Sequence, residues 1–128
     1  MSNNIKISLE IPQNRILDLL ITGFDQGILY WGKWFDNIIP IKTDKALEAR
    51  AGSGYAYPLI PGGAIIIQEW GYPEQKTYKL NLPAIKKGLN IMSEKYPIHF
   101  ADFIGQNEDA ITADVFIQCC IFGEVKYG

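Results

Sequence analysis

The sequence predicts an α+β domain in which a small, mainly antiparallel sheet packs against three or four helices, with the last helix in the centre. Residues 5–11 alternate strictly between apolar and polar side chains, which is typical of a half-buried strand. Residues 13–24 place their apolar side chains on one face at helical spacing. Residues 110–122 are apolar on almost every side, so we expect that helix to lie in the middle of the fold.

The first half of the chain mixes strong and weak patterns. Pro12 ends the first expected strand, and Gly27 marks the exit from the helix over 13–24. Residues 28–35 are rich in aromatic side chains, which favours a strand or an extended loop over a helix. The segment 43–50 fits either a short helix or a loop.

A short antiparallel meander is expected in the middle of the chain. Its pieces are residues 55–60, 64–70 and 75–80, separated by turn residues at 61–63 and 71–74.

The second half is predicted to be mainly helical. Asn81 or Leu82 stands near the cap of a helix over Ala84 to Lys95, with Pro83 in its first turn, and one or two further helical turns are expected at 100–104. Asp109 is a suitable N-cap for the last helix, and residues 124–127 are expected to add a final strand.

Composition limits the class of protein. The 128 residues carry 12 Lys and Arg against 14 Asp and Glu, a net charge of −2. The length fits a single domain over 1–128, and the near-neutral charge argues against a protein that binds nucleic-acid duplexes. No apolar run approaches the roughly 18 residues of a membrane span, and no signal-peptide pattern opens the chain. We therefore expect a cytoplasmic protein without membrane contacts.

The single histidine, His99, and the adjacent Cys119 and Cys120 limit the possible chemistry. Three residues cannot supply the four Cys or His ligands of a structural zinc site, and neighbouring cysteines form only a strained disulfide. The apolar surroundings of the cysteines favour buried, free thiols, while a Cys–His nucleophile pair stays open. His99 follows Pro97 in an aromatic setting and is interpreted as a packing residue or, alternatively, a catalyst. We expect neither a metal nor another cofactor.

Two polar residues interrupt the last helix. Asp114 and Gln118 are four residues apart and share one stripe of the helix. A carboxylate in an apolar helix must find hydrogen-bond donors or shift its pKa. Asp114 is therefore either a general base or ligand-binding group, or an internal acceptor for the backbone N–H groups of a loop.

The turn before the last helix holds Asn107 and Asp109. Asp109 as an N-cap is the structural interpretation. The functional interpretation is that an amide and a carboxylate beside a helix N-terminus bind the donor and acceptor edge of a purine.

Aromatic and basic residues in the first half supply further candidate contacts. Trp31 and Trp34 either form core and interface or stack on a base. Lys33 and Arg50 belong to a small basic group that suits a small anionic ligand better than a duplex. Because no nucleophile elbow, carboxylate pair or metal motif is present, we expect a binding protein and not an enzyme.

Both ends of the chain resemble a group of small phage and prophage proteins. Residues 107–118 match the pattern N-x-D-A-x-T-A-D-V-F-x-Q, and residues 123–128 match G-E-x-x-Y-G. Residues 27–31 are similar to that group's G-x-x-Y-W stretch, although its acidic E-G-G lead-in is altered to Asp25-Gln26-Gly27. The match covers about a third of the chain, and residues 36–80 depart from it.

This pattern is similar to the first Thoeris anti-defence family. Its members are oligomeric sponges that sequester cyclic ADP-ribose-type signals or cyclic oligonucleotides without cleaving them. The resemblance implies that His99 or Phe100, together with Asn107 and Asp109, holds the adenine of such a ligand. It also implies a homo-oligomer, which the aromatic content of the chain favours independently. Two alternatives stay open: a phage protein–protein interaction or virion accessory module, and a small hydrolase using His99 or Asp114.

Overall fold

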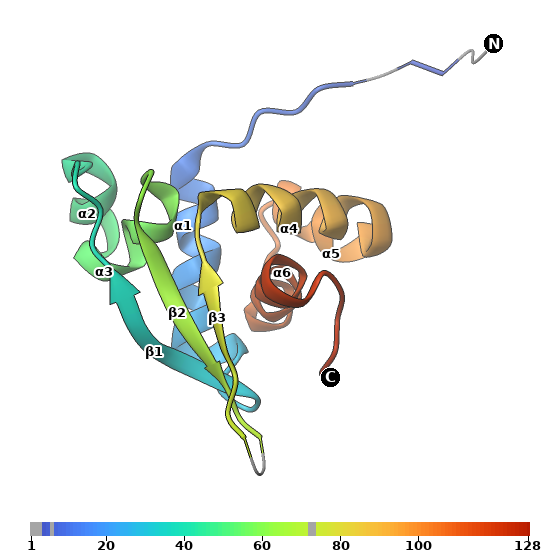
Figure 1. Cartoon of the computed structure of the whole chain (residues 1–128). Helices are drawn as coiled ribbons and strands as arrows, with labels where there is room; N and C mark the ends of the chain where they lie inside the picture. Colours follow the sequence, from blue (N-terminus) through green and yellow to red (C-terminus); the bar gives the residue numbers. More distant parts are fainter. Residues whose placement is uncertain (1–3, 6, 72–73) are drawn as a thin grey trace.

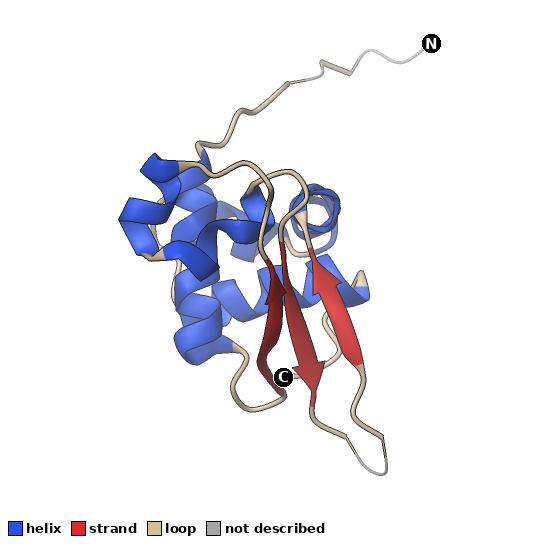
Figure 2. Ribbon diagram, turned by 60° about the vertical axis from the view of Figure 1, so that its left-hand side comes forward, coloured by secondary structure: helices blue, strands red, loops and turns tan. Residues whose placement is uncertain are grey.

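The computed structural model describes residues 4, 5, 7–71 and 74–128, and it confirms the α+β class. Within these residues, one three-stranded antiparallel sheet combines with helices that gather on one side of it (Figures 1 and 2). The described residues contain no helix that is both long and apolar enough to cross a membrane.

The sheet has the order β1-β2-β3. The strands are β1 (Gly32–Ile38), β2 (Ala64–Glu69) and β3 (Thr77–Leu80), and both neighbouring pairs are antiparallel. The strands predicted over 64–70 and 75–80 are thus confirmed. The aromatic strand begins later than residue 28, because Trp31 N donates to Ile28 O across a turn that precedes it.

Four of the helices were predicted from periodicity and capping residues. They are α1 (Gln13–Thr22), α4 (Leu82–Lys95), α5 (Pro97–Ile104) and α6 (Ala110–Phe122). The Asn81 side chain accepts a hydrogen bond from Ala84 N, and the Asp109 side chain accepts one from Thr112 N. Both residues are therefore N-caps, as their positions in the sequence indicate.

The segment between β1 and β2 is helical. α2 (Lys45–Ala51) begins after Asp44, whose side chain accepts from Leu47 N, so the helical alternative for 43–50 is the right one. The extended piece expected at 55–60 is wrong. α3 (Ser53–Ala56) and a 3-10 turn (Tyr57–Leu59) occupy this region, and Pro58 lies in that turn without an N–H to offer a strand.

Two further predicted strands do not form. The described residues among 5–11 are extended but pair with no described strand, and residues 124–127 form an irregular C-terminal segment (Figure 1). Periodicity records which side chains share a face, whereas a strand also needs a neighbouring strand for its backbone groups. The C-terminal backbone instead binds a side chain of α6, as described below.

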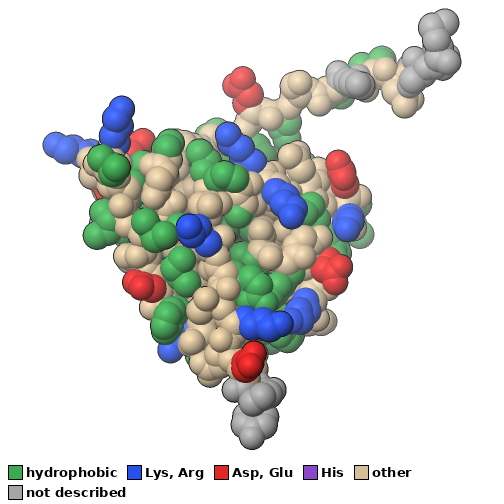
Figure 3. Space-filling view, in the orientation of Figure 1, with side chains coloured by type: hydrophobic (Ala, Val, Ile, Leu, Met, Phe, Trp, Pro, Cys, Tyr) green, Lys and Arg blue, Asp and Glu red, His purple; other side chains and the backbone are tan. Residues whose placement is uncertain are grey.

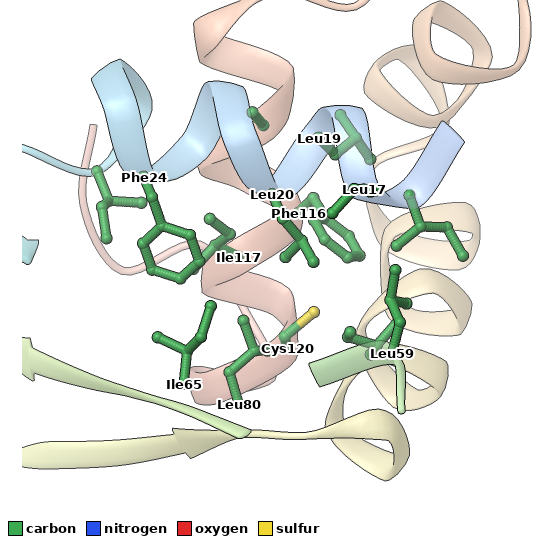
Figure 4. Close-up of a cluster of buried hydrophobic side chains, with 14 of the residues drawn as sticks. Leu17, Leu19, Leu20, Phe24, Leu59, Ile65, Leu80, Phe116, Ile117 and Cys120 are labelled. Carbon is green, nitrogen blue, oxygen red and sulfur yellow. The ribbon is translucent and has the colours of Figure 1, made fainter. Parts of the chain in front are cut away.

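The core surrounds α6, as predicted. Every residue from Thr112 to Cys120 is buried, and Phe116 and Ile117 pack against Leu17 and Leu20 of α1 (Figure 4). The other side of α6 lies against α4 at a glycine. A Cβ on Gly88 would lie 2.8 Å from the backbone N of Cys120, so the two helices approach more closely than a side chain allows.

Candidate functional site

A pocket of about 500 Å³ lies beside the N-terminal half of α6, and we call it the α6 pocket. It is bounded by the end of the π-helical turn Gly23–Gly27, by α5, by α6 and by the C-terminal segment. Gly27 brings this turn against α6, because a Cβ there would lie 2.7 Å from Ala110 O. The polar or aromatic side chains lining the pocket are those of Gln26, Tyr30, Tyr96, His99, Asp114 and Tyr127.

Asp114 is the centre of a hydrogen-bond network on one wall of the pocket. Its carboxylate accepts from the Tyr30 hydroxyl at 2.5 Å, from Trp31 Nε1 at 2.7 Å and from Gln118 Nε2 at 2.9 Å. Partial burial, followed by the hydrogen bond to Asp114 and its negative charge, raises the pKa of Tyr30 to about 12. Tyr30 therefore stays protonated and donates to Asp114 at neutral pH. The internal interpretation of Asp114 is right, although its donors are side chains and not loop N–H groups.

Gln118 fastens the C-terminal segment that forms another wall. Its Oε1 accepts from Lys126 N at 2.7 Å and from Tyr127 N at 2.9 Å, and its Nε2 donates to Tyr127 O at 3.1 Å. The Gln118 side chain is fully buried. One amide thus supplies the backbone partners that a neighbouring strand would have supplied.

Glu69 of β2 is a second anchor for the same segment. It accepts from Lys126 Nζ at 2.6 Å, from Tyr78 at 2.8 Å and from the Tyr127 hydroxyl. The Tyr127 ring also stacks on Trp31 with 5.6 Å between ring centroids and 7° between planes. The wall formed by Val125, Tyr127 and Gly128 is therefore held from both α6 and the sheet.

His99 brings an unsatisfied polar atom to the pocket. Its Nδ1 is buried, and it has no hydrogen-bond partner within the described part of the chain. Buried polar atoms are nearly always paired, so such an atom in the lining of a pocket is suited to bind a ligand group or a water molecule. The interpretation of His99 as a packing residue does not account for this unpaired nitrogen.

The predicted ligand-binding residues do not all meet in one place. His99 lines the α6 pocket, while Asn107 and the capping Asp109 are exposed just before α6 and are not among its lining residues. Trp31 is only 2% exposed and serves as a donor to Asp114, so its ring is not available for stacking on a ligand. Phe100 lines a separate groove beside α4.

The remaining predicted contacts lie elsewhere and have partners of their own. Trp34 packs on Phe24 and Tyr55, Lys33 lies over the ring of Trp70, and Arg50 forms an ion pair with Asp18. The basic group expected to meet an anionic ligand is therefore not part of the α6 pocket.

Sequence reasoning missed several lining residues. Tyr96, Gln26 and Tyr127 belong to three separate elements and follow no shared motif. Tyr30 lies in the aromatic-rich segment 28–35, and no sequence pattern distinguishes it from the other aromatic residues there. Its link to Asp114 joins positions 84 residues apart, which no local pattern reveals.

The cysteines and Asp114 are the other groups of the described chain that could take part in covalent chemistry. The described residues contain no group of three or more His, Cys, Asp or Glu side chains that could hold a metal ion. Burial raises the pKa of the Cys119 thiol to about 11 and that of Cys120 well above its ordinary value, so neither supplies a thiolate. Asp114 already accepts three hydrogen bonds.

Comparison with protein-family models, with curated proteins and with solved structures finds no match for this chain. The resemblance to phage anti-defence proteins therefore stays a prediction.

Proposed function

We propose that the protein binds a small nucleotide-derived signal in the α6 pocket and withholds it without cleaving it. The observation that carries this proposal is the buried, unpartnered Nδ1 of His99 in a pocket of nucleoside size. Ligand pockets in proteins commonly measure about 300–1,000 Å³ and combine apolar walls with a few convergent polar groups.

The chemistry of the pocket suits the base of the ligand. His99 Nδ1 and the Gln26 amide can pair with the donors and acceptors on the edge of a purine. The rings of Tyr30, Tyr96 and Tyr127 offer faces and edges for contact with a flat heterocycle, which is worth about 1–3 kcal/mol per stacked base.

The charge of the pocket orients such a ligand. Its lining within the described residues includes the Asp114 carboxylate and no Lys or Arg side chain. A phosphate in the interior would meet this negative charge without a compensating cation. The base therefore enters the pocket, while the phosphates stay outside it, away from the Asp114 carboxylate.

The fixed network around Asp114 supports sequestration. A general base must be free to accept a proton from the reacting group, whereas Asp114 is committed to Tyr30, Trp31 and Gln118. A rigid, satisfied wall instead preorganises the pocket and lowers the entropic cost of binding.

The test is a thermal-shift screen against cyclic ADP-ribose isomers and cyclic oligonucleotides, followed by mass spectrometry of ligand released by heating. A sponge gains thermal stability with one class of ligand and releases that ligand intact. The His99→Ala variant should lose the shift, and Ile98→Ala should keep it, because Ile98 belongs to the same helix but is 77% exposed and outside the pocket lining. Release of a hydrolysed nucleotide would show an enzyme instead.

A second candidate is a phage protein–protein interaction module. Exposed large apolar side chains favour it, among them Phe35 in the middle of β1 and Ile39 and Ile41 after its end. Figure 3 shows apolar side chains interspersed with Lys and Arg on the face that carries the sheet. This candidate predicts no shift with any nucleotide in the same screen.

A further inference from the structure

Residues 5–11 have the side-chain pattern of a strand, and the described ones among them, 5 and 7–11, are extended without pairing to any described strand. Figure 1 shows the described residues before α1 running away from the body of the molecule. Ile5 and Ile7 are 90% and 89% exposed, and Leu9 is 56% exposed. Alternating apolar side chains indicate a strand that buries one face. In a single copy of the chain, the apolar face of this segment stays exposed.

An open groove lies between this segment and α4. Its volume is about 760 Å³, and Leu9 and Ile11 line one side while Leu89 and Phe100 line the other. Leu89 and Phe100 are only half-buried. Lys86, Asn90 and Ser93 of α4 also line the groove, so its apolar surface on that side is limited to Leu89 and Phe100.

The sequence of residues 5–11 is complementary to itself in the antiparallel direction. When two copies are aligned about Ser8, Ile5 lies opposite Ile11 and Ile7 lies opposite Leu9. The same alignment places Lys6 opposite Glu10 twice, once on each side of the two-fold axis. Lys6 lies outside the described residues and enters this argument through the sequence alone.

We propose that two copies of the chain pair their segments 5–11 as an antiparallel ribbon, and that the apolar face of the ribbon covers the groove beside α4 in each copy. A two-stranded ribbon alone is marginally stable in water. Packing on Leu89 and Phe100 supplies the apolar surface that such a ribbon needs. A second copy is the occupant because it supplies both the apolar pairs and the opposite charges.

The first experiment reverses the charges in the full-length protein and measures dimer dissociation by sedimentation. Lys6→Glu or Glu10→Lys places like charges opposite each other twice per dimer, and each should raise the dissociation constant by about tenfold. The double variant restores opposite charges and should return the constant to within about threefold of the original value. A wild type that stays monomeric, single variants without effect, or a double variant no better than the singles would each overturn the proposal.

The second experiment tests the register by cross-linking. Residues directly opposite in an antiparallel pair have Cα atoms about 4.5–5.5 Å apart, within the range of a disulfide. Ser8→Cys should therefore form a disulfide-linked dimer under mild oxidation. Glu10→Cys is the matched control, because the two copies of residue 10 would lie about 13 Å apart, four residues along the strand.

The native cysteines do not interfere, because Cys119 and Cys120 are buried. Equal cross-linking of Ser8→Cys and Glu10→Cys, or none in Ser8→Cys, contradicts the proposed register. Neither result depends on the α6 pocket, so this inference and the proposed function are tested separately.

Discussion

The fully buried amide of Gln118 offers a direct test of how the pocket is built. Replacement by leucine keeps the approximate size of the side chain but removes its hydrogen-bonding groups. The C-terminal segment then loses the partners of Lys126 N, Tyr127 N and Tyr127 O, and Asp114 loses one of its three donors.

The magnitude follows from these four hydrogen bonds. Each contributes a net of about 0.5–1.5 kcal/mol, which gives about 2–6 kcal/mol if all four are lost without compensation. The freed backbone groups can reach water when the segment detaches, so the lower half of this range applies. We expect Gln118→Leu to lower the free energy of unfolding by about 2–4 kcal/mol.

Two measurements check this expectation. Urea denaturation gives the free energy of unfolding, and release of C-terminal residues by a carboxypeptidase reports detachment of the segment 124–128. Gln118→Glu is the informative companion variant, because it keeps an oxygen for the two backbone N–H groups but places a second carboxylate beside Asp114. Its defect should shrink as the pH falls and one carboxyl takes up a proton. A loss below about 1 kcal/mol in Gln118→Leu, with wild-type release rates, would refute this account of the wall.

Three further predictions follow from contacts in the core and the sheet. Gly88→Ala should lower the free energy of unfolding, measured by urea denaturation, by about 1–3 kcal/mol. The new Cβ would lie 2.3 Å from Cys120 Sγ and 2.8 Å from the Cys120 backbone, which outweighs the gain of about 1 kcal/mol in helix propensity. Burial on its own raises the pKa of Glu69, but hydrogen bonds from one lysine and two tyrosines outweigh it, so the pKa lies below its ordinary value of 4.5. Ionised Glu69 therefore stabilises the fold above pH 4.5, and this stabilisation is lost as the pH falls through the lowered pKa that Glu69 has in the folded protein. The urea midpoint of Glu69→Gln should depend less on pH in that range than the midpoint of the wild type. Cys119 and Cys120 should resist alkylation by iodoacetamide until the protein unfolds, and rapid labelling of the native protein would contradict their burial.

The helices were predictable because their signals are local. The apolar spacing of residues 13–22 and the uniform apolarity of 110–122 are properties of short windows, and each window corresponds to a helix. The capping roles of Asn81 and Asp109 are also local, since each side chain accepts from an N–H three residues later.

The strands were less predictable because pairing is not local. Residues 124–127 resemble a strand in composition, yet the N–H groups of Lys126 and Tyr127 bind Gln118 on α6, and the N–H group of Val125 binds the Tyr96 hydroxyl. Residues 5–11 have the clearest alternation in the chain, and the described ones among them still pair with no strand in the described parts of the chain. In both segments the sequence indicates an extended backbone, but it does not indicate which groups form hydrogen bonds with that backbone.

The candidate site was predictable only in part, for the same reason. His99 was recognised as the single histidine, and Asp114 as a polar exception on an apolar helix. The pocket that joins them forms because Gly27 contacts α6 and because the C-terminal segment binds Gln118. Both are contacts between distant parts of the chain.

This construction couples ligand binding to the order of the C-terminal segment. The segment forms one wall of the pocket through Val125, Tyr127 and Gly128, so a ligand that contacts this wall binds only when the segment is docked. Ligand binding must then stabilise the docked state by RT ln(1 + [L]/Kd), about 2.7 kcal/mol at a hundredfold excess over the dissociation constant. A true ligand of the α6 pocket should therefore slow release of the segment by carboxypeptidase about a hundredfold at that excess, when docking and undocking are fast relative to cleavage. A compound that raises thermal stability without protecting the segment binds somewhere else on the protein.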